Sequence, residues 1–117
     1  MSITADLIRG NTDAIILAQL MEQDSYGYRI NSAIRAATDN RYELKEATLY
    51  TAFRRLEEAG YITSYWGDED SGARRRYYRI TESGKSAYCQ MVHDFSSAYE
   101  LISKLILAGK DIATEGL

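Results

Sequence analysis

The C-terminal third of the chain carries the pattern that most constrains its fold. Residues 82–117 contain no proline, as is true of the whole chain, so a single unbroken helix can run from Glu82 to about Leu107. Apolar side chains recur along it at alternating spacings of four and three residues, which places them on one stripe: Tyr88, Val92, Phe95, Tyr99, Ile102 and Ile106. One small domain cannot cover a stripe of this length, so we expect it to pair with a second copy of the chain.

Shorter helical segments precede this stripe. Each is indicated by apolar residues at spacings of three and four positions, and by residues that favour helix ends. We expect helices at Thr12–Glu22, at 26–40 with Ser25 as N-cap, and at 46–59 with Gly60 just past the end, and a further helical segment at 3–9 that leads into the first of them.

A β-hairpin is expected between the third and the last helix. Residues 61–66 and 74–80 are rich in residues that favour strands, and residues 67–73 are rich in residues that favour turns. Thr81 then caps the last helix, and the chain from Gly109 onward is expected to be frayed. The predicted fold class is α+β, a winged helix-turn-helix (residues 1–81) followed by a long dimerisation helix and tail (residues 82–117).

The charge distribution indicates a nucleic-acid partner although the formal net charge is −3. Residues 71–85 contain four arginines and one lysine, with Glu82 as the only acid, while both ends of the chain are acidic. A local basic patch can contact phosphate groups even when the whole protein is negative. The sequence therefore predicts double-stranded DNA as a partner, bound near the hairpin.

The third helix has the composition of a helix that reads DNA. Its outer face offers small, hydroxyl and guanidinium side chains, and such a helix fits the major groove, which is about 12 Å wide. The predicted DNA-binding residues are Tyr28, Lys45, Thr48, Tyr50, Thr51, Arg54, Arg74, Arg75 and Arg76. Whether each contacts a base or a phosphate stays open, and the three consecutive arginines are also compatible with an ordinary solvated strand edge.

The sequence resembles the PadR-like transcriptional regulators. The matching blocks are Tyr26-Gly27-Tyr28-x-Ile30, Ala47-Thr48-Leu49-Tyr50, Arg55-Leu56-Glu57-x-x-Gly60-Tyr61-Ile62, Trp66, and the run from Gly72 to Gly84 that contains the three arginines. The resemblance implies a homodimer that acts as a repressor. Such a dimer places its two third helices in successive major grooves of a near-palindromic operator.

The single C-terminal helix is similar to that of the compact, multidrug-responsive branch of this family. The resemblance implies that planar aromatic effectors bind at the dimer centre, where Phe95 takes the place of a tryptophan and Tyr99 that of an acid. The expected effector-binding residues are Met91, Val92, Phe95 and Tyr99. Because Tyr99 carries no fixed negative charge, we expect weak preference for cationic compounds.

Other classes of function find little support in the sequence. Only one histidine and one cysteine are present, His93 and Cys89, which are too few for a metal site without carboxylates or a second subunit. Neither a phosphate-binding glycine loop nor a catalytic constellation is evident, so we expect neither an enzyme nor a cofactor. A winged helix used for protein contact remains the alternative. No apolar run approaches the length of a membrane span, and a cytoplasmic location is expected.

Overall fold

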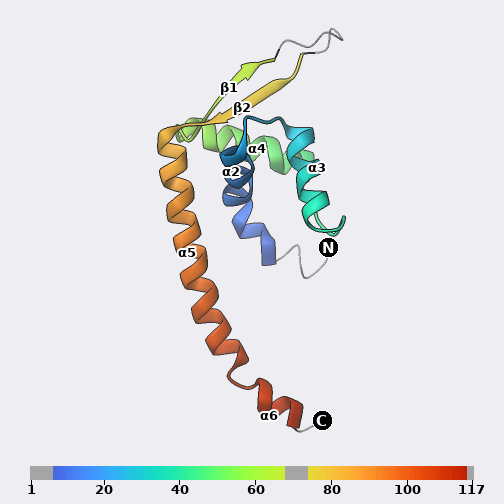
Figure 1. Ribbon diagram of the computed structural model, residues 1–117, viewed down its shortest axis with the longest axis vertical. Helices are drawn as coiled ribbons and strands as arrows, with labels where there is room; N and C mark the ends of the chain where they lie inside the picture. The colour runs from blue at the N-terminus through green and yellow to red at the C-terminus, as the bar shows by residue number, and fades with distance from the viewer. Residues whose placement is uncertain (1–6, 68–73, 116–117) are drawn as a thin grey trace.

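The computed structural model describes residues 7–67 and 74–115. In chain order its elements are the 3-10 helix η1 (Arg9–Asn11), α2 (Thr12–Glu22), α3 (Gly27–Ala37), α4 (Glu46–Glu58), β1 (Ile62–Trp66), β2 (Arg76–Ile80), α5 (Glu82–Leu107) and α6 (Lys110–Glu115). Figure 1 shows that α2, α3 and α4 form a cluster beneath the hairpin, while α5 extends far beyond that cluster. The molecule measures 63 × 29 × 21 Å as a result. The predicted winged-helix architecture is confirmed.

The core lies where α2, α3, α4 and the hairpin meet. Phe53 of α4 is its largest fully buried side chain, and its ring stacks on that of Tyr78 from β2 with a centroid distance of 3.9 Å. The other buried apolar residues come from every element of the cluster: Ile16, Leu17, Leu20, Ile30, Ile34, Leu44, Leu49, Ala52, Leu56, Ile62 and Ile80. Burial of these side chains is what holds the three helices against the hairpin.

The junction between α4, the hairpin and α5 depends on two glycines and one threonine. Gly60 has φ +80°, a left-handed conformation that ends α4 and turns the chain into β1. A Cβ atom on Gly84 would lie 2.1 Å from the carbonyl oxygen of Tyr61, so only glycine allows α5 to approach the hairpin this closely. The hydroxyl of Thr81 accepts a hydrogen bond from the Gly84 backbone at 3.0 Å, which confirms Thr81 as the N-cap.

The hairpin is antiparallel, and the turn before α3 extends it. Ile62 pairs with Ile80 at one end and Trp66 with Arg76 at the other. Ser25 forms an isolated bridge with Tyr78, with backbone hydrogen bonds of 2.8 and 3.2 Å in the two directions. The prediction of Ser25 as an N-cap was therefore wrong. Its backbone is used as a strand, and α3 begins at Gly27 with Tyr26 as N-cap.

The helix expected to reach residue 40 ends at Ala37, and two further features differ from the sequence analysis. The predicted strand from Arg74 starts only at Arg76, and the tail expected to be frayed forms the short helix α6. Most of the predicted segment 3–9 and of the turn 67–73 lies outside the described residues. None of the helices in the described part of the chain has the length and hydropathy that a membrane span requires.

Candidate nucleic-acid interface

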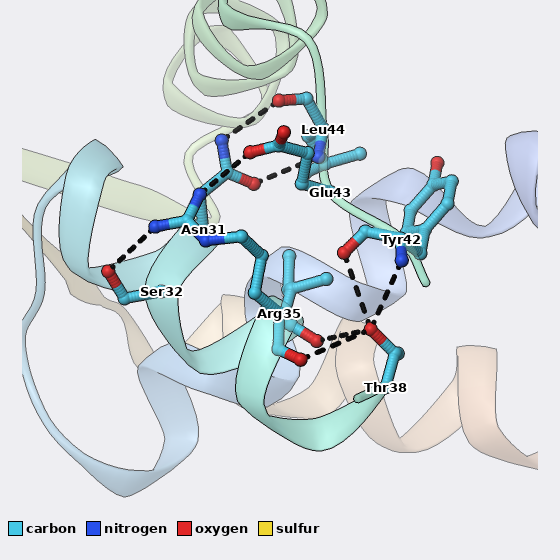
Figure 2. A network of polar contacts seen from close by, with 8 residues as sticks. Asn31, Ser32, Arg35, Thr38, Tyr42, Glu43 and Leu44 are labelled. Carbon is cyan, nitrogen blue, oxygen red and sulfur yellow. Dashed lines mark hydrogen bonds and ion pairs between the residues drawn. The ribbon is translucent and has the colours of Figure 1, made fainter. Parts of the chain in front are cut away.

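The start of α4 is fixed by a side-chain clamp from α3. The amide of Asn31 donates to the backbone oxygen of Leu44 at 2.8 Å and accepts from the Leu44 backbone nitrogen at 2.9 Å (Figure 2). The same network includes the ion pair of Arg35 with Glu43 at 2.7 Å and the Thr38 hydroxyl, which accepts from the backbone nitrogen of Tyr42 at 3.2 Å. Segment 41–45 is thereby held rigid, so the first turn of α4 has a defined direction.

The exposed surface of α4 divides into two flanks on either side of its buried face. Tyr50 lies on the flank toward α3, because its hydroxyl would be 3.2 Å from a Cβ atom on Gly27. Tyr50 is 47% exposed, and Arg54, one turn later, is exposed and held by no hydrogen bond or ion pair within residues 7–67 and 74–115. This flank can present an aromatic hydroxyl and a guanidinium group to a groove of DNA.

The opposite flank of α4 faces the N-terminal end of α2 and the helix α5. Thr48 and Thr51 are exposed there, and both line the groove described below. Arg55 on this flank donates from Nε to Asp13 of α2 at 3.2 Å, and its pKa is raised by this bonded partner. The predicted pair of threonines therefore does not share a flank with Tyr50.

The three predicted arginines of the wing lie on two different faces of the hairpin. The guanidinium carbons of Arg74 and Arg76 lie 5.5 and 6.0 Å from the ring of Trp66, whereas that of Arg75 lies 4.7 Å from the ring of Tyr26. This is the alternation that a strand imposes on successive residues. All three side chains are exposed and can contribute positive charge to a surface.

Arg76, a predicted DNA-binding residue, also has partners within the protein. It donates to the hydroxyl of Ser64 at 2.8 Å and pairs with Glu57 of α4 at 3.4 Å. Its charge is therefore partly neutralised by the fold. The wing is tied to α4 through this contact, so Arg76 contributes to the placement of the wing as well as to its charge.

Asp24 ties the other face of the wing to the turn before α3. Its carboxylate accepts from the Tyr65 hydroxyl at 2.6 Å and from Arg79 at 3.0 Å, so it contacts both strands. Burial raises the pKa of Asp24, but the hydrogen bonds from Tyr65 and Arg79 and the nearby positive charge lower it by more, leaving the pKa below its usual value. The bonded carboxylate in turn raises the pKa of Tyr65, which keeps the phenol protonated as a donor.

Two further predicted DNA-binding residues, Tyr28 and Lys45, lie at the starts of α3 and α4. Tyr28, on the first turn of α3, is 73% exposed, and the guanidinium carbon of Arg35 lies 5.8 Å from its ring. Lys45 is exposed at the N-cap of α4. The two residues thus lie at the N-terminal ends of the two helices of the helix-turn-helix, where a DNA backbone can approach.

The predicted dimerisation stripe of α5 changes character along the helix. Tyr88 packs against the core of its own chain and is only partly accessible. From there on the stripe is open, because Val92, Phe95, Tyr99, Ile102 and Ile106 are between 43% and 70% exposed. The free apolar surface thus begins one turn later than the sequence pattern indicated.

A groove of about 1410 Å³ runs between α5, the start of α2 and the flank of α4 that carries Thr48 and Thr51. Met91, Phe95 and Tyr99, three of the four residues expected to bind an effector, line it, whereas Val92 is exposed but does not. The rings of Phe95 and Tyr99 lie 6.0 Å apart and 30° from parallel, an offset stack. Asp94 also lines the groove, so an acid is present although position 99 holds a tyrosine.

The model of the transcriptional regulator PadR-like family matches residues 16–90, which include α3, α4, the wing and the start of α5. The chain belongs to this family. An uncharacterized protein from Lysinibacillus sphaericus is 41% identical over 98% of both chains. The solved structure of a transcriptional regulator from Clostridium thermocellum is 50% identical, with a TM-score of 0.78 over 85% of this chain and 96% of that one.

Another solved PadR-like structure contains DNA. Bacillus subtilis PadR in complex with operator DNA is similar with a TM-score of 0.62 and 22% identity, over 68% of this chain and 44% of that one. At this identity the likeness shows a shared fold. The family membership rests on the match of residues 16–90, and the DNA contacts of individual residues in this chain stay predictions.

Three residues that shape the interface were not predicted from the sequence. Asn31 and Asp24 position α4 and the wing, and Arg29 lies between them at the start of α3, 5.1 Å from the ring of Tyr26. The spacing between partners explains the omission, because Asn31 is 13 residues from Leu44 and Asp24 is 55 residues from Arg79. Arg29 occupies the position written x in the motif Tyr26-Gly27-Tyr28-x-Ile30, so the motif gave no signal for it either.

Proposed function

We propose that this protein is a transcriptional repressor that binds a near-palindromic DNA operator as a homodimer. The observation that carries the proposal is the exposed flank of α4 with Tyr50 and Arg54, together with a wing whose two faces present three exposed arginines. Tyr50 and Arg54 on α4 are exposed, and the clamp between Asn31 and Leu44 orients that helix. A protein of the same fold, Bacillus subtilis PadR, forms a complex with operator DNA, which supports the proposal.

In the proposed complex, α4 enters the major groove and the wing follows the adjacent backbone. Tyr50 and Arg54 reach base edges or phosphates, Lys45 and Tyr28 lie against the backbone at the helix starts, and Arg74 and Arg75 add phosphate contacts. Phosphate contacts supply most of the affinity, whereas base contacts supply the preference for one sequence. Residues 1–81 form the DNA-binding unit in this proposal.

Residues 82–117 form the dimerisation unit. Val92, Phe95, Tyr99, Ile102 and Ile106 expose apolar surface along one stripe of α5, and pairing with a second copy removes it from water. A two-fold dimer then places its two α4 helices about 34 Å apart, one turn of DNA. Half-site spacing and operator symmetry follow from that geometry.

An effector that binds in the groove can control the dimer. Planar aromatic compounds fit beside Phe95 and Tyr99, and the groove extends to Thr48 and Thr51 on α4. A compound held there contacts both the dimerisation helix and the helix that reads DNA. Its binding shifts the population toward dimers whose α4 helices no longer match successive grooves, which releases the operator.

Selection of DNA from a random pool by the purified protein tests the proposal. We expect enrichment of a two-fold symmetric sequence with half-sites separated by one helical turn, about 10–10.5 base pairs. Selection with Arg54→Ala in parallel serves as a control for base reading. No enrichment by the wild-type protein would reject DNA reading, and it would favour a winged helix that contacts another protein.

A further inference from the structure

We propose that Trp66 contacts DNA, and that its indole ring packs against the sugar–phosphate strand beside the major groove that α4 reads. Arg74 supplies the neighbouring phosphate contact. Trp66 belongs to the motifs that indicate the family, but it was not among the predicted DNA-binding residues. The inference rests on the proposed DNA-binding function and deepens it, because it names an apolar contact and the face of the wing that makes it.

Trp66 is left half open to solvent at the outer end of the hairpin. It is the last residue of β1 and is 54% exposed, whereas Ile62 at the first position of the strand is buried. On the paired strand Tyr78 is also buried, because its ring stacks on Phe53 of the core. The hairpin projects away from the helices toward its tip, so burial decreases outward (Figure 1). The open part of the indole ring is apolar area that a bound molecule can bury.

The exposed flank of α4 ends at the wing. Tyr50, Arg54 and Glu57 follow one another at spacings of four and three residues, so they lie on one side of the helix. The carboxylate of Glu57 accepts from the Ser64 hydroxyl at 2.9 Å and pairs with Arg76 at 3.4 Å. The surface that carries Tyr50 and Arg54 therefore continues onto the face of the hairpin that holds Ser64 and Arg76.

Trp66 lies farther out on that same face. Alternate residues of a strand point to the same side, so Ser64 and Trp66 share a face of β1. Arg76 is paired with Trp66 across the hairpin, and its guanidinium carbon lies 6.0 Å from the centre of the indole ring. Double-stranded DNA that lies on the exposed flank of α4 and extends toward the tip of the wing therefore meets Trp66.

Positive charge beside the ring suits a phosphate backbone. The guanidinium carbon of Arg74 lies 5.5 Å from the centre of the Trp66 ring, and the Arg74 side chain is exposed and makes no ion pair with another described residue. Arg76 is partly neutralised by Glu57, so Arg74 is the arginine of this face that contacts phosphate. Each nucleotide of DNA presents a sugar next to an anionic phosphate, which matches an indole ring next to a guanidinium group.

Fluorescence tests the contact directly, because Trp66 is the only tryptophan of the chain. Quenching by acrylamide is measured for the full-length wild-type protein, alone and saturated with the selected operator. We expect the quenching constant to fall to about half or less in the complex, because the DNA covers the exposed part of the ring. Unchanged quenching in the complex would overturn the contact.

A second reporter tests the choice of face. The variant Trp66→Phe/Thr63→Trp moves the tryptophan to an exposed position on the other face of β1. Its quenching constant should stay the same when the operator binds. Protection of the reporter at both positions would overturn the assignment of the contact to one face of the wing.

Binding measured at several salt concentrations separates the ring from the charge. Trp66→Ala should weaken binding to operator and to random DNA alike, by roughly tenfold or more in a dimer that loses two apolar contacts, with an unchanged salt slope. Trp66→Phe keeps an aromatic ring and should recover most of the affinity. Arg74→Ala should instead lower the salt slope by about 0.9 for each phosphate group that a subunit no longer neutralises. If Trp66→Ala binds as well as wild type, or if Trp66→Phe binds no better than Trp66→Ala, the ring does not contact DNA.

The measurements distinguish failure of this inference from failure of the proposed function. If wild type binds the operator and Trp66 stays equally accessible to acrylamide, the contact is wrong and the DNA-binding function stands. If wild type binds no DNA, the proposed function fails and the contact fails with it. Thermal unfolding of each variant is recorded, and the quenching of the wild-type protein requires no substitution, so it decides even if Trp66→Ala loosens the hairpin.

Discussion

The protein uses its two phenylalanines in opposite ways. Phe53, in the unit of helices and hairpin that we call the head (residues 9–67 and 74–80), is 1% exposed, whereas Phe95, on the free part of α5 that we call the arm (residues 92–107), is 53% exposed. The head buries its apolar side chains within one chain, while the arm presents them outward. This difference indicates that the head folds on its own chain and that the arm needs a covering partner to keep its apolar stripe from water.

The largest expected effect separates the two regions directly. Phe53→Ala removes a ring that stacks on Tyr78 and fills the centre of the head, so we expect a loss of about 3–5 kcal/mol in the free energy of unfolding. Phe95→Ala makes the same chemical change on the arm and should leave unfolding of the head nearly unchanged. Urea denaturation followed by circular dichroism compares them. Equal losses in both variants would contradict the division into head and arm.

The next effect is on assembly. Ile102→Asp places a charge in the middle of the exposed stripe of the arm, where a dimer would bury it without a partner. We expect sedimentation to show a dimer for wild type and a 13.3 kDa monomer for the variant at micromolar concentration, with the helical signal of the head retained. Specific DNA binding should be lost at the same time. A monomeric wild type would refute the dimer.

A smaller effect concerns the reading surface of the head. Arg54→Ala removes an exposed guanidinium group from α4, and base contacts of this kind contribute about 1–3 kcal/mol of discrimination. We expect binding to the operator to fall about tenfold or more, with a smaller loss on random DNA. Competition titrations measure both. If Arg54→Ala weakens both DNAs equally, Arg54 contacts the backbone instead of a base.

The groove that lies between head and arm should show a weaker effect. Titration calorimetry with planar aromatic dyes is expected to detect binding to wild type, with Phe95→Ala weaker by about 0.5–1.5 kcal/mol because one stacking ring is removed. Comparing the affinities of cationic and neutral dyes tests whether Asp94, which also lines the groove, gives the preference for cations that Tyr99 does not. No binding of any dye, with only a looser dimer in Phe95→Ala, would assign Phe95 to packing of the arm.

The smallest effect is the pH dependence of the stability that Asp24 contributes by joining Tyr65 and Arg79 of the wing to the turn before α3. The pKa of Asp24 is lowered in the folded protein, so its contribution to stability is complete above the ordinary value of 3.8 and is lost as the pH falls below it. Asp24→Asn should therefore be less stable than wild type at neutral pH by about 1 kcal/mol or less, and the difference should shrink in acid. A difference that grows in acid would contradict this sign.

The sequence by itself determined the elements and their order. Predicted and observed bounds agree for Thr12–Glu22 and Glu82–Leu107, and Gly60 and Thr81 take the positions expected of them. These features depend on the period of apolar side chains, on end-forming residues and on the absence of proline, all of which act within a few residues. Local features of the sequence also predicted the basic wing and the apolar stripe, and the motifs indicated the family.

Only the tertiary structure decided which residues of different elements contact one another. Ser25 was expected as a cap but pairs with Tyr78 as a strand, and Arg76, expected to contact DNA, also pairs with Glu57 of α4. Tyr88, at the start of the predicted stripe, packs on the head of its own chain. These outcomes depend on partners far away in sequence, such as Asp24 and Arg79, which are 55 residues apart. The spacing of apolar residues acts over a few positions and cannot predict such contacts, because packing of the core brings these partners together.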